Sequence, residues 1–419
     1  MRISTSQFFL SSLNDMLAQE GKVSQLNQQI ATGQTLTDAT QDPAGAAGVL
    51  NLAKQIAQVT TDGTTAQNSA NSVNETLSVM NEINNLLNQV RSTALQGAAA
   101  TTPSAQRQAL AGQVQSSLAE LIQLANTQLP NGQYIFGGSQ STNQPFQQLA
   151  GTVVYNGDAG VQNVEIAPAL QVPVTVSGQA AFMRVPDGNG SFAVSAGGAN
   201  TGQAVATLGA VVNPALVATE HLNDTQFQVA FSAGPGTSIA YTVTSGTGAP
   251  GSPSFIASST VVASGTYSGG SLGLSFGGVN VSFDGTPSAG DSFTVRTSQN
   301  TTVFQAIQDV INGLNAPIDS PPGARSIADQ MIQGSLSTLQ QAQNSLLSTE
   351  ATMGTTLAEI NAVQAQDNNV TTADQVALGN LQGGNLPQTI MQFNAGVTAL
   401  QAAQAAYGKI SGLSLFNVI

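Results

Sequence analysis

The chain has 419 residues, of which 7% are charged, with 9 Lys and Arg against 22 Asp and Glu and a formal net charge of −13. An acidic chain of this kind disfavours nucleic acid and anionic membrane surfaces as partners, because both are bound through clustered basic side chains. It has no Cys and one His, His221. That inventory excludes disulfides, thiol catalysis and zinc sites built from Cys or several His, and we expect no metal or cofactor.

Apolar runs along the chain are short. No window approaches the roughly 18 consecutive apolar residues of a membrane-spanning helix. Phe8-Phe9-Leu10 is too short for the core of a secretory signal peptide. Gln, Asn, Ser and Thr take the place of charged residues. This composition favours an exported or extracellular protein, and a cytosolic protein of unusual composition is the alternative.

A change in composition divides the chain into three stretches. Residues 131–320 hold 27 of the 43 Gly and 15 of the 20 aromatic residues, whereas residues 1–130 and 321–419 are rich in Ala, Gln, Asn, Leu and Ser. Gly-rich and aromatic sequence with short alternating runs is typical of β-structure, and Ala/Gln/Leu-rich sequence with three- and four-residue spacing is typical of helix. The pattern predicts helices, then sheet, then helices.

The first flank carries apolar residues at helical spacing. Asp42-Pro43 resembles a helix cap followed by Pro at the first helical position. We expect helices before a turn at Thr32-Gly33, over about 64–97, and from Thr102-Pro103 to Pro130-Asn131-Gly132. The apolar rows are Leu10, Leu13 and Leu17 continuing into Val23, Leu26 and Ile30; Val73, Leu77, Met80 and Leu87; Val79, Ile83, Leu86 and Val90; and Leu110, Val114, Leu118, Leu121, Ile122 and Leu129.

The second flank mirrors the first. An apolar row keeps a spacing close to seven residues, which is typical of coiled coils, and Gln343 and Glu350 occupy two of its positions, where polar residues lower stability but fix register. Gly383-Gly384 breaks this helix and Pro387 opens the last one. The two rows are Ile332, Leu336, Leu339, Leu346, Met353, Leu357 and Ile360, and then Ile390, Phe393, Val397, Leu400 and Tyr407.

The middle stretch contains several short alternating runs. Gly277-Gly278 between two of them predicts a hairpin, and Asp284-Gly285 predicts a second turn. Because strands and helices do not alternate, the sequence disfavours a parallel nucleotide-binding sheet, and only the stretch from Phe304 to Leu314 returns to helix. The predicted strands include Val172–Val176, Phe227–Phe231, Tyr241–Thr244, Leu272–Phe276, Val279–Phe283 and Ser292–Val295.

No catalytic constellation is present in the sequence. Gly188-Asn189-Gly190 lacks the strand–turn–helix context of a phosphate-binding loop and is interpreted as a turn. His221 has no Gly-x-Ser-x-Gly nucleophile to serve and is predicted to lie in a solvated loop. Asp284 and Asp291 are too few for the six to eight oxygen ligands of Ca²⁺ and are interpreted as turn formers. We predict that the protein is not an enzyme.

The two ends of the chain are more apolar than free ends normally are. Burial of one Leu or Phe side chain contributes about 1.5–3 kcal/mol, which these stripes forfeit in water. The sequence therefore predicts that the ends pair with each other and then with further copies; an ordinary bundle within one chain is the alternative. The predicted assembly seam comprises Leu10, Leu13, Leu17, Leu26, Ile30, Ile390, Phe393, Val397, Leu400, Tyr407, Ile410, Leu413, Leu415 and Phe416.

Several motifs resemble the flagellar axial proteins, the flagellin-like family of bacterial flagella, and among them the hook–filament junction members. The ending from Lys409 to Ile419 is similar to the tail of the junction members rather than that of flagellin. The matching motif residues include Asp42, Pro43, Tyr134, Phe136, Gly137 and Gly138, within the blocks Met1–Gln7, Gln28–Gly33, Asp42–Ala46, Asn131–Gly138, Tyr155–Asp158, Phe182-Met183, Gly188–Gly190 and Ala399–Phe416.

The resemblance implies an elongated α+β fold with long coiled-coil-like helices from both termini packed together and mostly antiparallel β-domains inserted between them. It implies a ring of copies that contacts hook-associated protein 1 and flagellin outside the cell, after flagellar type III export with a chaperone on the C-terminal helix. The division implied is 1–40 and 385–419 as assembly helices, 41–150 and 301–384 as a helical rod, 151–194 as its β-rich part, and 195–300 as an outer β-domain.

Three alternatives remain open at this point. A flagellin-type filament subunit shares the same helix plan and would polymerise into long filaments. A secreted adhesin or polymer-degrading enzyme would need a cleft with converging ionisable groups near Asp284 and Asp291. A cytosolic coiled-coil scaffold leaves the Gly-rich β-insert unexplained.

Overall fold

The protein is an α+β chain, as predicted, in which long helices flank antiparallel sheets. The computed structural model describes residues 2–34, 42–149, 151–247, 256–267, 269–320 and 322–416. The chain divides into two compact units, one made of Met1–Ala66 with Ala362–Ile419 and the other of Gln67–Asn361. The finer six-part division made from the sequence stays a prediction.

The first unit is helical in its described part. It contains α1 (Arg2–Thr32) and α7 (Leu386–Phe416), which run antiparallel, together with the first part of α2 (Pro43–Ala98) and the last part of α6 (Ala324–Gln382). Asp42 begins α2 as predicted, because its carboxylate Oδ1 accepts a 2.9 Å hydrogen bond from the Gly45 N–H.

The helical part of the second unit packs the rest of α2 and α6 with α3 (Ser104–Ala125) and α5 (Val303–Asn315). Both apolar rows of α2 are needed here, because one row meets α6 while the other meets the shorter helices. Their fully buried members form the core between the helices. These include Val73, Met80, Ile83, Leu87, Val90, Val114, Leu121, Ile307, Val310, Ile332, Leu339, Leu346 and Ile360.

Two small hairpins and a compact aromatic cluster follow α3. Strands β1 (Phe146–Leu149) and β2 (Thr152–Tyr155) pair, as do β3 (Asn163–Ala167) and β4 (Leu170–Pro173), and a π-helical turn spans Gln179–Met183. The cluster joins this region to α5 through ring contacts with centroids 4.9–5.8 Å apart. Its members are Phe136, Phe146, Tyr155, Phe182 and Phe304.

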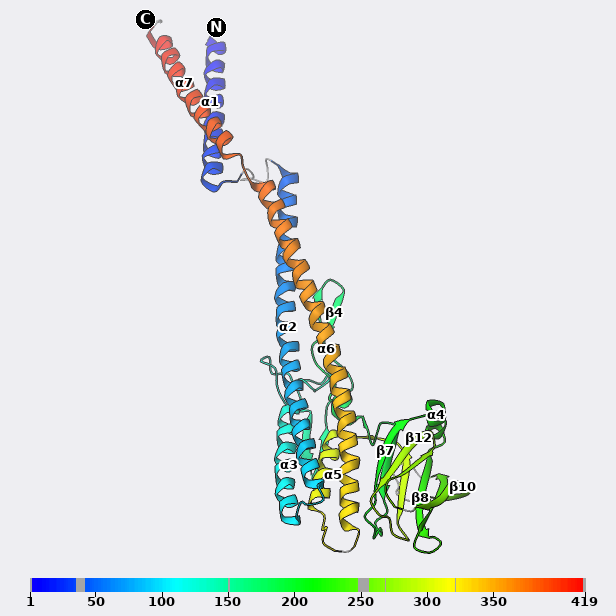
Figure 1. Ribbon diagram of the computed structural model, residues 1–419. Coiled ribbons are helices and arrows are strands. Elements are labelled where there is room, and N and C mark those ends of the chain that lie inside the picture. Colours follow the sequence, from blue (N-terminus) through cyan, green and yellow to red (C-terminus); the bar gives the residue numbers. More distant parts are fainter. Residues whose placement is uncertain are drawn as a thin grey trace. The chain divides into compact units, whose positions relative to one another are not determined.

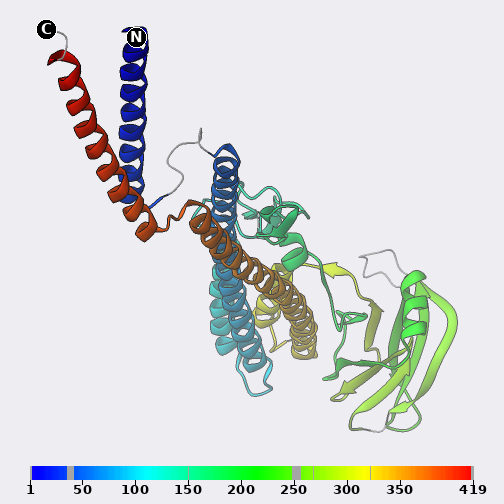
Figure 2. The ribbon, with the colours of Figure 1, turned by 90° about the horizontal axis from the view of Figure 1, so that it is seen from above.

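Residues 192–247, 256–267 and 269–297 form a sandwich of two antiparallel sheets, which we call the outer β-domain after the predicted part that it overlaps (Figure 2). The predicted hairpin is confirmed: Phe276 pairs with Val279, and Gly277 and Gly278 both have positive φ. The larger sheet has the order β10 (Ile256–Tyr267), β9 (Ile239–Thr247), β8 (Thr225–Ala233), β13 (Ser292–Thr297) and β6 (Phe192–Ala196), and the smaller has β11 (Leu272–Phe276), β12 (Val279–Asp284) and β7 (Val205–Val211). A two-residue ladder between β5 (Val185–Pro186) and β14 (Asn300–Thr301) lies where the chain enters and leaves this domain.

Two helix predictions are corrected by the structure. The helix expected over about 64–97 begins at Pro43, so the Asp42-Pro43 cap and the later apolar rows belong to one continuous helix. The helix expected to reach Pro130 ends at Ala125, because the Asn126 amide turns back to the Ile122 carbonyl (2.9 Å) and also accepts from the Phe146 N–H (2.9 Å).

Two further local predictions are also corrected. His221 lies in the last turn of α4 (Pro214–Leu222) rather than in a loop, and an Asn213-Pro214 start signal for this helix is visible in the sequence. The strand predicted over Val172–Val176 ends at Pro173, because the amides of Val174 and Val176 donate to Gln162 and Ile135, which lie in separate loops and form no ladder.

A candidate assembly surface on the terminal helices

Helix α1 carries two apolar rows on different sides. The inner row repeats every seven residues at Phe9, Met16, Val23 and Ile30, all half-buried, and Leu26 between them is buried. A strict seven-residue repeat keeps one helix face on its partner along its whole length. This row faces α7.

Helix α7 matches it with its own seven-residue repeat of Phe393, Leu400 and Tyr407, all half-buried. The Tyr407 ring meets the Phe9 ring edge-on with centroids 5.7 Å apart. At mid-length the helices approach closely at Gly396, where an added Cβ would lie 3.1 Å from a Val23 methyl group. The two terminal helices therefore form one antiparallel pair.

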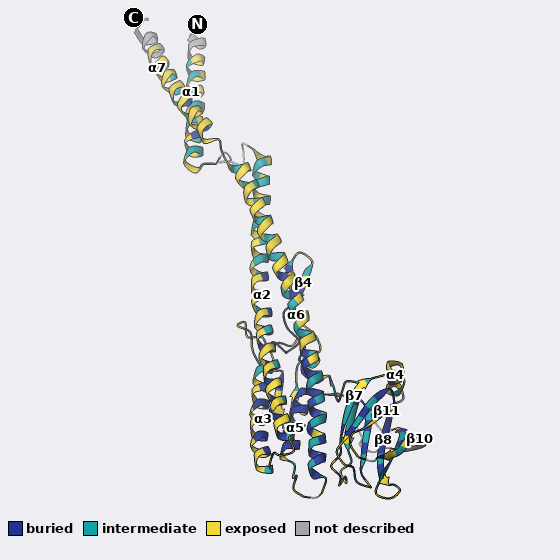
Figure 3. Ribbon diagram, viewed as in Figure 1, coloured by how far each residue is buried: buried dark blue, intermediate teal, exposed yellow. Residues whose placement is uncertain are grey.

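The outer row of α1 is left uncovered by this pairing. Much of the ribbon of α1 is coloured as exposed or half-buried in Figure 3. Leu10, Leu13 and Leu17 are 60%, 43% and 56% exposed. They follow helical three- and four-residue spacing, so they form a stripe rather than scattered single residues. Exposed stripes of this kind mark contact sites between proteins.

The structure thus divides the predicted seam between two surfaces. Leu10, Leu13 and Leu17 do not continue into the row of Leu26 and Ile30, because the two rows lie on different sides of α1. On α7, Ile390 is exposed and joins Met391 and Leu386 on the solvent side. Phe393, Val397, Leu400 and Tyr407 are half-buried. The side chains of Ile410, Leu413, Leu415 and Phe416 lie outside the described residues.

Sequence reasoning missed two members of the inner row, Phe9 and Met16. The signal was available, because Phe9, Met16, Val23 and Ile30 stand exactly seven residues apart along α1. Leucine content alone does not distinguish the face that pairs within the chain from the face that stays free.

The remaining motif residues lie in closely packed, hydrogen-bonded turns beside the aromatic cluster. Gly138 has φ +70, and a Cβ there would lie 2.6 Å from the Asp158 carbonyl oxygen. The Asp158 carboxylate accepts the Ser139 N–H at 2.7 Å and its hydroxyl, and these hydrogen bonds lower the pKa of Asp158. The Tyr155 hydroxyl donates to the carbonyls of Phe136 (3.1 Å) and Asp158 (2.8 Å), and burial raises its pKa. Tyr134 and Gly137 lie in the same turn, joined by a hydrogen bond from the Gly137 N–H to the Tyr134 carbonyl.

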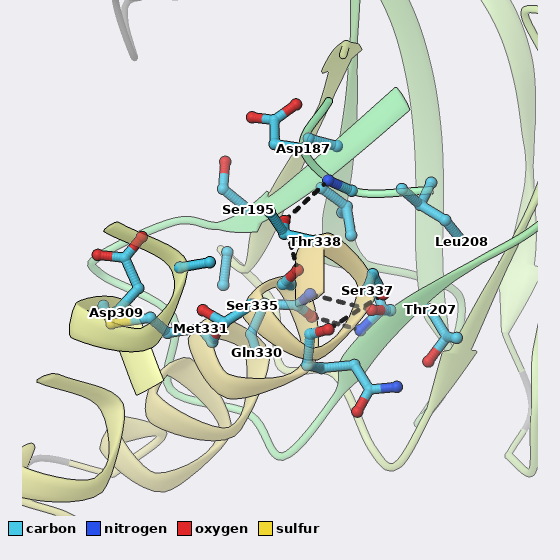
Figure 4. Close-up of a pocket in the computed structure, with 18 of the residues that line it drawn as sticks. Asp187, Ser195, Thr207, Leu208, Asp309, Gln330, Met331, Ser335, Ser337 and Thr338 are labelled. Atoms are coloured by element: carbon cyan, nitrogen blue, oxygen red, sulfur yellow. Dashed lines mark hydrogen bonds between the residues drawn. The ribbon is translucent and has the colours of Figure 1, made fainter. Parts of the chain in front are cut away.

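A cavity of about 340 Å³ lies between α5, α6 and strands β6 and β7 (Figure 4). Its floor is held by hydrogen bonds from the Gly188 N–H to Thr338 Oγ1 (3.2 Å) and between the Gln330 amide and the Ala206 peptide group. Asp309 lines it, and burial raises the pKa of that carboxyl. These groups are engaged with the fold and do not converge on one point, so the cavity offers no reaction centre.

The structure places Asp291, Asp284 and His221 at separate positions in the outer β-domain. The Asp291 carboxylate is buried and accepts N–H groups of Thr201 (2.7 Å) and Ser288 (2.8 Å), which makes it a turn former, as predicted. Asp284 is exposed at the end of β12, and His221 Nε2 contacts the Ser191 carbonyl at 3.0 Å. Within the described residues, no three His, Asp or Glu side chains gather as a metal site would require.

None of the helices in the described ranges combines the length and the apolar character that crossing a membrane requires.

Comparison with known proteins agrees with this architecture. Residues 3–141 match the bacterial flagellin N-terminal helical region. Flagellar hook-associated protein 3 of Salmonella typhimurium is 25% identical over 173 residues, which cover 41% of this chain and 54% of that protein, and the Escherichia coli protein is 23% identical over 172 residues. This chain therefore spans about half the length of the curated relatives it matches.

Solved structures extend the likeness over most of the chain. Flagellar hook-associated protein 3 from Legionella pneumophila superposes with a TM-score of 0.69 at 25% identity, over 80% of this chain and 98% of that one. FlgL from Xanthomonas campestris gives 0.65 at 26% identity, over 77% and 99%. Over most of its length the chain is similar to flagellar hook-associated protein 3.

Proposed function

We propose that the protein is a structural subunit of the bacterial flagellum that joins the hook to the flagellin filament. In this proposal copies form a ring outside the cell after type III export, and contact hook-associated protein 1 on one side and flagellin on the other. A second solved relative, from Legionella pneumophila, is described as the flagellar junction protein FlgL, with a TM-score of 0.67 at 26% identity. That likeness supports the proposal.

The observation that carries the proposal is the uncovered stripe of Leu10, Leu13 and Leu17. Pairing with α7 covers the inner row of α1 but leaves the outer row exposed to solvent. Each large apolar side chain gains about 1.5–3 kcal/mol on full burial, so a neighbour that covers the stripe gains several such contributions. A second copy or a related axial protein with matching terminal helices supplies such a face.

The stripe is tested by Leu13→Asp, which places a charge where a neighbour would bury an apolar side chain. We expect bacteria that carry only this variant to export the protein but to shed filaments. The thermal unfolding of the purified variant, followed by the circular dichroism of its β-domain, should stay unchanged. The matched control is Leu222→Asp, because Leu222 is 88% exposed on α4 of the outer domain. Normal filament attachment with Leu13→Asp would contradict the proposal.

A filament subunit of the flagellin type is the alternative outcome. Both proteins would use the same terminal helices, so the stripe alone does not separate them. Electron microscopy of the purified protein under polymerising conditions does: a junction subunit should form at most short rings, and a filament subunit should form long filaments.

The proposed export chaperone is tested separately. A chaperone that shields the C-terminal helix should bind the protein through α7 before export. The exposed residues Ile390 and Met391 offer it an apolar contact. Ile390→Asp should weaken its co-purification with the cytoplasmic protein, whereas Leu222→Asp should leave it unchanged.

A further inference from the structure

The helix α6 carries one uninterrupted seven-residue repeat on the face toward α2. The repeat runs from Ile332 to Leu378 with alternating steps of four and three residues, and each of its positions is buried or half-buried. Such a repeat is a coiled-coil seam. Its members are Ile332, Leu336, Leu339, Gln343, Leu346, Glu350, Met353, Leu357, Ile360, Gln364, Asp367, Thr371, Asp374 and Leu378.

Up to Ile360 the seam is apolar except for two polar layers, in which the polar side chains of α6 are hydrogen-bonded from α2, although Asn84 Oδ1 has no partner within the described residues. The Gln343 amide donates to Asn88 Oδ1 (2.9 Å) and accepts from Arg91 (2.6 Å). Glu350 accepts from the Asn84 amide at 3.4 Å. Each polar side chain in this stretch therefore has a specific partner on the facing helix.

Beyond Ile360 the seam changes character. Four consecutive positions, Gln364, Asp367, Thr371 and Asp374, are polar. We call residues 43–66 of α2 and 362–382 of α6 the distal pair. The two helices are close here, because a Cβ on Gly48 would lie 3.5 Å from a Leu381 methyl group. The distal pair therefore places carboxylates where a coiled coil normally places Leu.

The facing side of α2 offers these carboxylates few side-chain donors. Its half-buried positions in this stretch are Gly and aliphatic residues except for Asp62, a second carboxylate, and Thr65, whose hydroxyl donates to the Thr61 carbonyl at 3.1 Å. The Gly and aliphatic positions are Gly45, Ala46, Gly48, Val49, Leu52, Ile56, Val59 and Gly63. One oxygen of Asp367 and one of Asp374 is shielded from solvent and has no hydrogen-bond partner within the described residues. A shielded carboxylate oxygen without a donor costs free energy.

The charged groups around the seam add to this cost. Asp62 on α2 is the charged neighbour of Asp367, and its carboxylate accepts from Gln58 at 2.8 Å. Lys54, the other charged group in this part of α2, is exposed and forms no ion pair within the described residues. Burial, and then the charge of Asp62, raise the pKa of Asp367. A raised folded-state pKa means that closure of the pair strengthens as pH falls from neutral toward that pKa.

We propose that the distal pair is a proton-sensitive contact, held weakly closed while the Asp367 side chain is charged and closed more tightly when that charge is removed. The shielded oxygen of Asp374 is a second unpartnered group in the same seam. The lower seam, with its partnered polar layers, does not share this property. The proposal concerns the chain itself and stands whether or not the protein occupies the flagellar junction.

Amide hydrogen exchange of the full-length protein tests the proposal peptide by peptide. At pH 7.5 the variant Asp367→Asn/Asp374→Asn should raise protection across 43–66 and 362–382 by about three- to tenfold, since the shielded groups no longer carry charge. The control is Glu359→Gln, which removes one charge from an exposed position of the same helix. It should leave these peptides unchanged.

A pH series separates this cause from a general effect of charge. Protection factors of the distal pair in the wild-type protein should rise between pH 7.5 and 5, after correction for intrinsic exchange, and should stay flat in the double variant. Equal protection of both proteins at pH 7.5, or a fall in the variant, overturns the proposal.

Discussion

At the scale of single residues, Arg107 joins four helices from a position with no exposed surface. From α3 its guanidinium donates to the Gly97 carbonyl at the end of α2 (3.1 Å), to the Gly313 carbonyl near the end of α5 (2.9 Å) and to Asp329 on α6 (2.6 Å). A cation at helix C-termini is favoured by the carbonyl groups that point toward it. We expect Arg107→Met to lower the free energy of urea unfolding by about 3–5 kcal/mol, because it removes the 2.6 Å ion pair of the half-buried Asp329 and leaves it only the 3.8 Å pair with Arg325.

The control for this prediction is Arg184→Met, at an exposed position, which should change the unfolding free energy by less than about 0.5 kcal/mol. Adding Asp329→Asn to Arg107→Met should recover part of the loss, since burial already raises the pKa of Asp329 and disfavours its charge. A double variant as unstable as the single one would mean that the lost carbonyl contacts dominate.

At the scale of elements, α6 holds the outer β-domain through the edge of β7. Gln330, 2% exposed, accepts the Ala206 N–H (2.6 Å) and donates to the Ala206 carbonyl (3.0 Å), so its amide replaces a neighbouring strand. Gln330→Leu should therefore speed hydrogen exchange of the Ala206 amide and lower unfolding stability by about 1–3 kcal/mol. Gln333→Leu, on the same helix, is the control, and an unchanged Ala206 exchange rate in Gln330→Leu would contradict this role.

Gln330 is one of the residues whose role could not be predicted from the sequence. Periodicity predicted the α+β class, most helices and the Gly277-Gly278 hairpin, because these features depend on residues close together in the chain. It predicted that Gln343 and Glu350 lie in a helix seam, which their contacts with α2 confirm. It did not identify Gln330 or Arg107, because each forms a hydrogen bond with a backbone group more than 100 residues away in the sequence. Only the packing of the folded chain brings these groups together. Periodicity also merged the two rows of α1, whose separation depends on which face α7 covers.

At the scale of the whole molecule, acidic charge sets the response to pH. The chain carries 22 carboxylate side chains against 9 Lys and Arg, so repulsion between them is greatest near neutral pH and above. Burial raises the pKa values of Asp309 and Asp329 in the second unit. A folded state with raised carboxyl pKa values binds protons more readily than the unfolded chain. Stability then increases as pH falls through those values and levels off below the unfolded value of 3.8.

We therefore expect the thermal midpoint of the second unit, followed by the circular dichroism of its β-domain, to be higher at pH 5 than at pH 7.5. Carboxylates with lowered pKa values, such as Asp158, act in the opposite direction only at lower pH, because they stay charged through this range. The variant Asp309→Asn should reduce the difference between the two midpoints, and the exposed Asp284→Asn should leave most of it. A midpoint that falls on acidification from pH 7.5 to 5 would show that ion pairs such as Asp187 with Arg296 outweigh burial and repulsion together.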